Sequence, residues 1–538
     1  MNGTTRRTLL GATCLLLGTV LKGQDNWLAL LTDPRANVFA VDDAFHRWAD
    51  SARAHVAGRA ENDGTLKRFR GLEKRYIRWR DKAEKRMDYS GHQSHQALWR
   101  AFHERQVRSG QRSQLGQWTC IGPTMDTTLK GLGVVSAIAI HPANDSIMYI
   151  STWSSGTWRT ADLGATWEEV TSVPPGESIP VFDPVDGDVL YLLVGGKFLK
   201  STDGGDNWTE LLSEDPSLLY GARIIINPEN TQVIDLITYG RTLRTADGGQ
   251  TWSLLNESTL LDATPRPDDH SVWYAIRTRT GGGTADFLMR STDGGITFDT
   301  LTTLPDANIA RAIAVTPADP DRLYVLHPGA EGIGTGRVLM SVDGGLSFNS
   351  PPVSDLVRAS GNLITLKASP TDPDLVFMGG IFLRRSTDAG LTWQAVHQGD
   401  FELPDYMHVD TRAFVVHDGV PWSCNDGGIY RSLDDGITWE DRTNNLILSP
   451  ITDFDWSPTD PEVIVFGAVH NSFALHLNGQ WRTYGGGDGY NVAVDANDPY
   501  HVIGTSQYGE PNVSMDQSLA LNYAINGITE SGYGFSAD

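Results

Sequence analysis

The sequence predicts an all-β protein, a β-propeller of four-stranded blades preceded by a short α-helical segment. Three observations lead to this prediction. An eight-residue motif, Ser/Thr-x-Asp-x-Gly-x-Ser/Thr/Asn-aromatic, occurs seven times. The Asp residues of consecutive copies are 41 to 50 residues apart, and a strand–turn–strand pattern such as AIAVTPADPDRLYVL recurs before the copies. A repeat of about 45 residues is typical of one propeller blade.

The composition of the motif, called the box below, indicates a tight hairpin turn. Its carboxylate and its leading hydroxyl can accept backbone N–H bonds within the turn. Its Gly tolerates a positive φ, and its final ring can be buried between neighbouring sheets. We therefore predict a structural role for the seven box aspartates, which are Asp162, Asp203, Asp247, Asp293, Asp343, Asp388 and Asp434.

Seven boxed blades are predicted over residues 116–447, and one or two blades without a box over residues 448–538. The strand–turn–strand pattern returns at Pro458 and at Pro499, but no complete box follows either copy. Two arrangements fit this pattern. One ring has more than seven blades, or a second ring begins near Leu448.

The segment before the propeller, residues 24–115, is predicted to be helical and basic. Apolar residues recur there at spacings of three and four, and Asn62 to Gly64 interrupt the pattern. Residues 51–115 hold sixteen Lys and Arg against seven Asp and Glu. Such helices suit packing against an acidic surface or binding of an anionic partner.

The rest of the chain is acidic. Residues 116–538 contain 54 Asp and Glu against 22 Lys and Arg. Nucleic acid is an unsuitable partner for this charge, because phosphates would be repelled. Cys120 and Cys424 are the only cysteines after residue 23; a disulfide between them is left open. We predict no cofactor and no metal.

Residues 1–23 are predicted to be an export signal. Arg6 and Arg7 precede an apolar stretch of about fourteen residues, which is too short to span a bilayer. The paired arginines permit twin-arginine export and also suit the general secretory route. No later segment is long and apolar enough for a membrane span. The expected location is therefore extracellular or in the cell envelope.

The seven boxes, the stretch WTCIGPTMDTTLKGLGVVSAIAIHP and the stretch NDGGIYRSLDDGITW resemble those of secreted bacterial Asp-box propeller proteins. These are the sortilin/VPS10-like and glycosyl-hydrolase BNR-repeat proteins. The basic segment at residues 66–91 is similar to the region before the propeller in large type IX-secreted proteins of Bacteroidetes. The resemblance implies the fold and not the activity, because Asp boxes occur in enzymes, sorting receptors and assembly factors.

Two enzyme families were weighed within this resemblance. Sialidases carry an Arg-Ile-Pro motif, which is absent here. Family 74 xyloglucanases use two aspartates. Trp153 stands where the first is expected, and Asp426, in Asn-Asp-Gly-Gly-Ile, loosely matches the second. Replacement of one carboxylate puts that mechanism in doubt, since an inverting glycosidase needs two.

The candidate site lies on the propeller face opposite the boxes, where the B–C and D–A connections of the blades meet. His408, Asp410, Asp426 and Asp488 make its densest polar cluster. Arg412, expected to pair with Asp410 or Asp426, stands where related proteins often have a second His. A structural hydrogen-bond network, an ion or ligand site and a catalytic pair all remain open. Further candidate ligand-binding residues are Trp153, Tyr239, Arg241 and His470.

The leading hypothesis from the sequence is a secreted scaffold that binds a glycan or an extracellular protein. The alternative is a glycoside hydrolase of the family 74 architecture, in which Asp426 acts with Asp410 or Asp488 as acid and base. A third class, an assembly or sorting factor, also fits the fold.

Overall fold

The computed structural model describes the chain in two compact units, Met1–Gly116 and Gln117–Asp538. The described residues are 27–28, 30, 37–56, 64–84, 99–100, 102–106, 120–123, 131–213, 223–238, 241–256, 260–278, 286–304, 312–327, 337–349, 365–396, 407–484, 487–506, 510–514 and 522–523. The expected export signal and Tyr239 lie outside these residues. Among the described residues, no helix has the length and apolarity needed to cross a membrane.

The first unit contains two long helices, α3 (Val38–Val56) and α4 (Gly64–Glu84). Their shared core is aromatic: the rings of Phe45 and Tyr76 stack with centroids 3.5 Å apart, and Trp27 is fully buried beside them. Arg53 on α3 donates to Glu73 on α4 at 2.9 Å. Of the predicted break at Asn62–Gly64, only Gly64 is among the described residues, and it is the first residue of α4.

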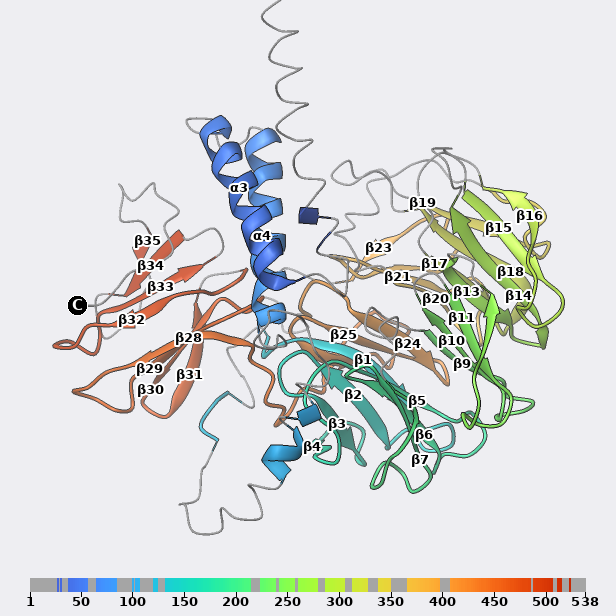
Figure 1. Ribbon diagram of the computed structural model, residues 1–538, viewed down its shortest axis with the longest axis horizontal. Helices are drawn as coiled ribbons and strands as arrows, with labels where there is room; N and C mark the ends of the chain where they lie inside the picture. The colour runs from blue at the N-terminus through green and yellow to red at the C-terminus, as the bar shows by residue number, and fades with distance from the viewer. Residues whose placement is uncertain are drawn as a thin grey trace, which may run out of the picture. The chain divides into compact units, whose positions relative to one another are not determined.

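The second unit is almost entirely β structure. Nine antiparallel sheets are present in its described part, eight with four strands and one with three (Figure 1). Within each sheet the strands are neighbours in chain order, as expected for consecutive hairpins.

The first four sheets each have four strands. Their strands are β1 (Val135–Ile140), β2 (Met148–Thr152), β3 (Thr157–Thr160), β4 (Glu168–Glu169); β5 (Ser178–Phe182), β6 (Leu190–Val194), β7 (Lys197–Ser201), β8 (Thr209–Leu212); β9 (Arg223–Ile226), β10 (Ile234–Thr238), β11 (Arg241–Thr245), β12 (Ser253–Asn256); and β13 (Leu260–Arg266), β14 (Asp269–Thr278), β15 (Asp286–Ser291), β16 (Asp299–Thr303).

The fifth sheet has three strands, and an isolated bridge between Met340 and Asn349 stands beside them. The strands of the fifth, sixth and seventh sheets are β17 (Ala312–Thr316), β18 (Asp319–His327), β19 (Arg337–Ser341); β20 (Thr365–Ala368), β21 (Val376–Gly379), β22 (Arg384–Ser386), β23 (Gln394–Ala395); and β24 (Ala413–His417), β25 (Val420–Asn425), β26 (Gly428–Arg431), β27 (Glu440–Asp441).

Two further sheets follow the last box. The eighth consists of β28 (Ile451–Trp456), β29 (Ile464–Ala468), β30 (Phe473–Leu477) and β31 (Gln480–Tyr484). The ninth consists of β32 (Val492–Val494), β33 (Val502–Ser506), β34 (Glu510–Ser514) and β35 (Asn522–Tyr523). They pack on each other through an apolar cluster of Val463, Val465, Phe473, Leu475, Val492, Val494 and Val502.

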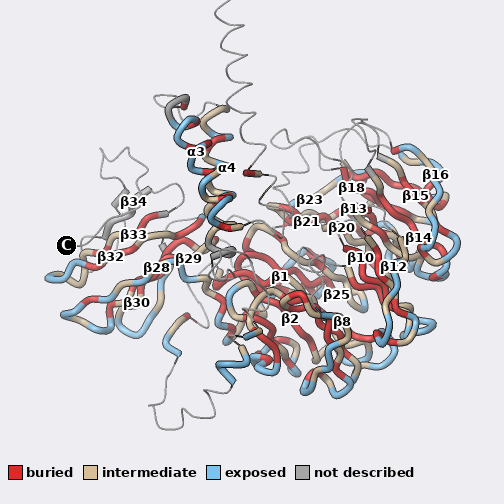
Figure 2. Tube along the Cα trace, viewed as in Figure 1, coloured by how far each residue is buried: buried red, intermediate tan, exposed pale blue. Residues whose placement is uncertain are grey.

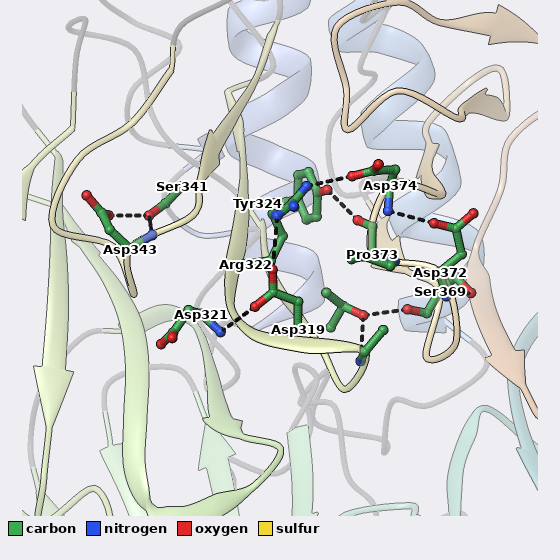
Figure 3. Close-up of polar contacts among 12 residues, drawn as sticks. Asp319, Asp321, Arg322, Tyr324, Ser341, Asp343, Ser369, Asp372, Pro373 and Asp374 are labelled. Atoms are coloured by element: carbon green, nitrogen blue, oxygen red, sulfur yellow. Dashed lines mark hydrogen bonds and ion pairs between the residues drawn. The ribbon is translucent and has the colours of Figure 1, made fainter.

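Each box forms the turn that its residues predict. In the fifth sheet, the Ser341 hydroxyl donates to Asp343 Oδ1 at 2.7 Å (Figure 3). The same hydroxyl oxygen accepts the Gly345 N–H at 2.9 Å. Asp343 in turn accepts the backbone N–H of Ser347 at 2.9 Å and its hydroxyl at 2.6 Å. The same backbone N–H bond to the Asp recurs in the other six boxes, so these aspartates are held inside turns.

The boxes also explain the glycines at their fifth position. Gly345 has φ 87°, and a Cβ there would lie 2.5 Å from the Leu288 side chain of the preceding sheet. A residue with a side chain would therefore meet both backbone strain and a steric clash. Gly249 and Gly436 show the same close approach, since a Cβ there would lie 2.3 Å from the Leu211 side chain and 2.6 Å from the Phe377 side chain of the preceding sheet.

The core lies between successive sheets, where the strands are buried and the turns are exposed (Figure 2). Polar contacts join the turns as well. Between the fifth and sixth sheets, the Tyr324 hydroxyl donates to the Pro373 carbonyl and Arg322 pairs with Asp374, both at 2.6 Å (Figure 3). Each sheet thus supports its neighbour by apolar burial and by hydrogen bonds.

The seventh sheet packs directly against the first. Trp422, Cys424 and Ile429 of the seventh share one buried cluster with Val135 and Ile138 of the first. The Trp167 indole donates to the Arg442 carbonyl at 2.8 Å, and the Asn445 amide donates to the Trp167 carbonyl at 2.9 Å. The eighth sheet is therefore not inserted between them. Cys424 is buried there, Cys120 is exposed, and both thiols are free.

Candidate functional site

Several of the predicted site residues meet in one cluster, called the junction cluster below. It contains Asp410 and Arg412, which precede β24, and Asp426, which lies between β25 and β26. His470, between β29 and β30, and Asp488, beyond β31, come from the eighth sheet and its exit. Trp153, which follows β2 in the first sheet, completes it. Three sheets contribute to the junction cluster.

The ion pair between Arg412 and Asp426 is the centre of the cluster. Arg412 Nη2 donates to Asp426 Oδ2 at 2.7 Å, and Arg412 Nε donates to Asp426 Oδ1. The Asp426 side chain is fully buried. Burial alone would raise the pKa of Asp426, but the hydrogen bonds from His470 and Arg412, together with the guanidinium charge, outweigh it and hold that pKa well below its usual range. Asp426 is therefore a fixed carboxylate.

His470 is held between acidic and basic groups. Its Nδ1 lies 2.9 Å from Asp426 Oδ2, and its Nε2 lies 3.3 Å from Arg412 Nη2. Since the guanidinium has only donors, Nε2 acts as the acceptor and Nδ1–H donates to Asp426. The His470 backbone N–H donates to Asp488 Oδ1 at 3.0 Å, and the Tyr490 hydroxyl donates to Asp488 Oδ2 at 3.1 Å. The buried Asp488 thereby orients the loop that carries His470.

Trp153 covers one side of this network. Arg412 Cζ lies 4.4 Å from the centroid of the Trp153 ring, a cation–π contact. The His470 ring meets the same indole at 5.1 Å and 62°. Trp153 is partly exposed, so its indole presents an apolar surface next to a fixed polar group. That combination suits a sugar ring, which has an apolar face and a polar edge.

Asp410 is the partly exposed carboxyl of the cluster. A carboxylate oxygen of Asp410 lies within 4.8 Å of ligand atoms of Asp426 and His470. Three such groups could share a cation on distance alone. However, both oxygens of Asp426 already accept from Arg412, so this donor set suits a cation poorly.

The three carboxylates predicted as catalytic have unequal access to solvent. Asp426 and Asp488 are fully buried, whereas Asp410 is partly exposed. Both oxygens of Asp426 also accept hydrogen bonds from Arg412. The geometry therefore disfavours Asp426 as an acid or base that contacts substrate.

The remaining candidate residues have other positions. His408 is buried, its Nδ1 lies 2.9 Å from the Val409 carbonyl, and its Cβ packs against Gly427. Arg241 begins β11 in the third sheet and is not part of the junction cluster.

Sequence reasoning assigned no role to the residues that support the cluster from behind. The Asn471 amide donates to the Asp426 carbonyl at 3.0 Å. The Leu132 N–H donates to the Gly427 carbonyl at 2.9 Å, and a Cβ on Gly131 would lie 2.9 Å from the Gly427 Cα. No local motif marks these contacts, because each joins segments far apart in the chain. The Gly-Gly pair after Asp426 was the one available signal.

The chain is similar to three curated xyloglucanases over short segments. It is 29% identical over 94 residues to a probable oligoxyloglucan-reducing end-specific xyloglucanase of Neosartorya fischeri, 28% identical over 130 residues to a xyloglucanase of Paenibacillus sp, and 29% identical over 140 residues to a xyloglucanase of Acetivibrio thermocellus. These matches cover 15%, 19% and 21% of this chain. They span only 12%, 13% and 17% of the relatives' own length.

The fold is similar to that of solved glycoside hydrolase family 74 (GH74) enzymes. The enzyme of Niastella koreensis superposes with a TM-score of 0.55 at 19% identity, over 75% of this chain and 68% of that chain. The xyloglucanase of Xanthomonas campestris gives 0.50 at 15% identity, over 73% and 74%. No protein-family model matches the chain. The comparisons show a propeller-like fold, and they favour the hydrolase hypothesis over the binding-scaffold hypothesis.

Proposed function

We propose that this chain is a GH74-like glycoside hydrolase that engages a polysaccharide at the junction cluster. One observation carries the proposal. Asp410, a partly exposed carboxyl, lies within 4.8 Å of the fixed Asp426 and His470. The partly exposed indole of Trp153 packs against the same His470. A proton-carrying group and a sugar-stacking group are thus held by one rigid network.

Each residue has a distinct role in this proposal. Asp410 exchanges a proton with the glycosidic oxygen or with a water. Trp153 stacks on a sugar ring next to that bond. Arg412 and Asp426 touch each other and not the substrate, so they are positioning residues for Trp153 and His470. A second carboxyl for hydrolysis comes from outside the junction cluster, since Asp488 is buried and bonded.

The proposed substrate is a neutral plant or microbial β-glucan of the xyloglucan type. The similarity to xyloglucanases supports this class. The acidic propeller, with 54 Asp and Glu against 22 Lys and Arg over residues 116–538, also favours a glycan without charge over an acidic one.

Glycan binding without cleavage is the second candidate. It is favoured by the state of Asp426, because both of its carboxylate oxygens already accept hydrogen bonds from Arg412. It is also favoured by Trp153, which stands where the resemblance expects a catalytic Asp. In this case the junction cluster is a rigid sugar platform.

The test pairs a hydrolysis assay with a binding assay on purified full-length protein. Release of reducing ends from xyloglucan and from other β-glucans is measured beside affinity electrophoresis in the same glycans. For a hydrolase, Asp410→Asn abolishes cleavage and leaves retardation in the gel. For a binder, wild-type protein cleaves no glycan. Trp153→Ala then migrates through the glycan-containing gel without retardation, whereas Asp410→Asn is still retarded. Wild-type protein that neither cleaves nor binds would refute both candidates.

A matched control is Glu229→Gln, which changes an exposed carboxyl in a turn of the third sheet. It should alter neither cleavage nor retardation. Equal thermal unfolding midpoints for Asp410→Asn, Trp153→Ala and the control would show that any loss is local to the junction cluster.

We also propose that the seven boxed sheets form one closed ring and that the eighth and ninth sheets belong to a second array. Contact of the seventh sheet with the first supports closure. A secreted or envelope location remains a proposal that rests on residues 1–23 and on the polysaccharide-acting relatives.

A further inference from the structure

Two turns meet where the first sheet contacts the seventh. Asp145 lies in the turn between β1 and β2, His417 ends β24, and Asp418 follows it in the turn to β25. One ring nitrogen of His417 and one carboxylate oxygen of each Asp all lie within 4.8 Å of one another. These three side chains, called the turn triad below, therefore bridge the two sheets.

The contact between His417 and Asp145 is short but is not a hydrogen bond. His417 Nε2 lies 3.2 Å from Asp145 Oδ1. Nε2 is buried and has no hydrogen-bond partner, so Oδ1 lies away from the direction in which the ring nitrogen bonds. Two ligands of one metal ion have this relation, because each points at the ion and not at the other. With Zn–N and Zn–O bonds of about 2.0–2.1 Å, neighbouring ligands of a tetrahedral site are about 3.3 Å apart.

Neighbouring turns elsewhere in this unit are joined by arginine. Arg266 Nη1 pairs with Asp321 Oδ1 between the fourth and fifth sheets, and Arg322 Nη1 pairs with Asp374 Oδ1 between the fifth and sixth, both at 2.6 Å. A guanidinium has only donors, so it satisfies the carboxylate without any metal. Between the seventh and first sheets a histidine stands beside two carboxylates instead. Among the described residues, no Lys or Arg pairs with either of these carboxylates.

The ligand types of the turn triad suit zinc. An imidazole nitrogen and carboxylate oxygens are ligands that Zn²⁺ takes in proteins, and a water can complete the tetrahedron. Ca²⁺ and Mg²⁺ take oxygen ligands, so the imidazole disfavours them. Asp145 and His417 are 47% and 24% exposed in their side chains, so an ion can reach the triad from solvent. The junction cluster differs, because Arg412 already pairs with Asp426 there.

We propose that Asp145, His417 and Asp418 bind a zinc ion that joins the first sheet to the seventh. The ion takes the part that arginine plays between the other turns. Because the triad is assembled only when the two sheets are in contact, zinc binds the folded protein and stabilises it. The proposal does not depend on the proposed hydrolase activity.

The test is zinc binding by the untagged full-length protein after treatment with EDTA. Isothermal titration calorimetry with zinc chloride gives the affinity, and thermal unfolding with and without zinc gives the shift in midpoint. Wild-type protein should bind zinc, and its midpoint should rise. His417→Gln and Asp145→Asn each remove one ligand, from different turns. Each should weaken binding by about 10–100-fold or more and abolish the rise in midpoint.

His501→Gln is the matched control. His501 also lies in a turn beside two aspartates, but its Nδ1 and Nε2 contact different ones, Asp495 at 3.9 Å and Asp498 at 3.7 Å. The variant should therefore bind zinc like wild type. Loss of zinc binding in this variant, with binding kept in His417→Gln, would overturn the proposal.

Three other outcomes also decide the matter. Wild-type protein that binds no zinc overturns the proposal. Zinc binding that neither His417→Gln nor Asp145→Asn weakens overturns it as well, and indicates an adventitious ion only. Loss of binding in Asp410→Asn alone would place the zinc in the junction cluster, which also overturns it. If His417→Gln fails to fold, Asp145→Asn, which changes a half-exposed side chain, decides the test.

Discussion

Arg412 donates two hydrogen bonds to the fully buried carboxylate of Asp426, and the indole of Trp153 lies against the Arg412 guanidinium. The pair joins the first, seventh and eighth sheets through side chains. It fixes His470 as well, whose ring contacts all three of these residues. The stability of the junction cluster therefore depends on the pairing of the buried Asp426 carboxylate with the Arg412 guanidinium.

Asp426→Asn is expected to destabilise the protein. It leaves the Arg412 charge without a carboxylate in a buried site, and removal of one partner from a buried pair costs about 3–5 kcal/mol. Urea unfolding followed by tryptophan fluorescence measures the change. The double variant Arg412→Gln/Asp426→Asn should recover part of the loss, since no unpaired charge remains. A single variant as stable as wild type would contradict the importance of the pair.

Ser341→Ala is expected to lower the free energy of unfolding by about 1–3 kcal/mol, because the buried N–H of Gly345 loses its acceptor. Ser347→Ala in the same box should cost less, since its hydroxyl is exposed. Thermal unfolding of the two variants under identical conditions gives the comparison. Equal losses would mean that the leading hydroxyl is not the residue that holds the turn.

The box aspartates should make stability depend on acid pH. Hydrogen bonds from the side chain and backbone of Ser347, and from Ser341, lower the pKa of Asp343 to about 2, against an ordinary 3.8. A carboxylate with a depressed pKa in the folded state adds stability that is present above pH of about 4 and is lost as the pH falls through about 2. Asp343→Asn should unfold at a lower temperature than wild type at pH 6.

The difference between Asp343→Asn and wild type is the quantity to follow. Unfolding midpoints measured from pH 6 to pH 2 should converge between pH 4 and pH 2, because the wild-type carboxyl becomes protonated there. A gap that stays constant down to pH 2 would show that the charge of Asp343 adds nothing to the turn.

The two free cysteines should differ in reactivity. Cys120 is exposed, whereas burial strongly raises the pKa of the Cys424 thiol, so little thiolate forms. Iodoacetamide at pH 8 should label Cys120 in the native protein and Cys424 only in denaturant, as read by peptide mass spectrometry. Rapid native labelling of Cys424 would mean that the contact between the first and seventh sheets opens readily.

The sequence predicts those parts of the structure that are built from local contacts. Each box bond joins residues within four positions of each other, as between Asp343 and Ser347, so the motif alone specifies the turn. Hairpins then follow in order. The eighth and ninth sheets, whose first turns contain Pro458 and Pro499, were predicted from the same local pattern, even without boxes.

The junction cluster is different, because its contacts cross the chain. Arg412 was expected to pair with Asp410 or Asp426, and the structure selects Asp426, 14 residues away. No sequence motif predicts the contact of Arg412 with Trp153, because the two residues are far apart in the chain. His470 reaches Asp426 only because the eighth sheet meets the seventh there. The contact between the seventh and eighth sheets decides which carboxylate is buried, and the amino-acid composition does not predict that contact.

The chain segment that leads into the first sheet lies next to the segment that leaves the seventh sheet. The Leu132 carbonyl accepts the Ser449 hydroxyl at 3.0 Å, and the Leu448 carbonyl accepts the Ser154 hydroxyl at 2.5 Å. When the two ends of a folded segment lie close together, the segment can be inserted into a loop of another protein without distortion of its backbone. For the same reason it tolerates circular permutation, in which new termini are placed at a turn.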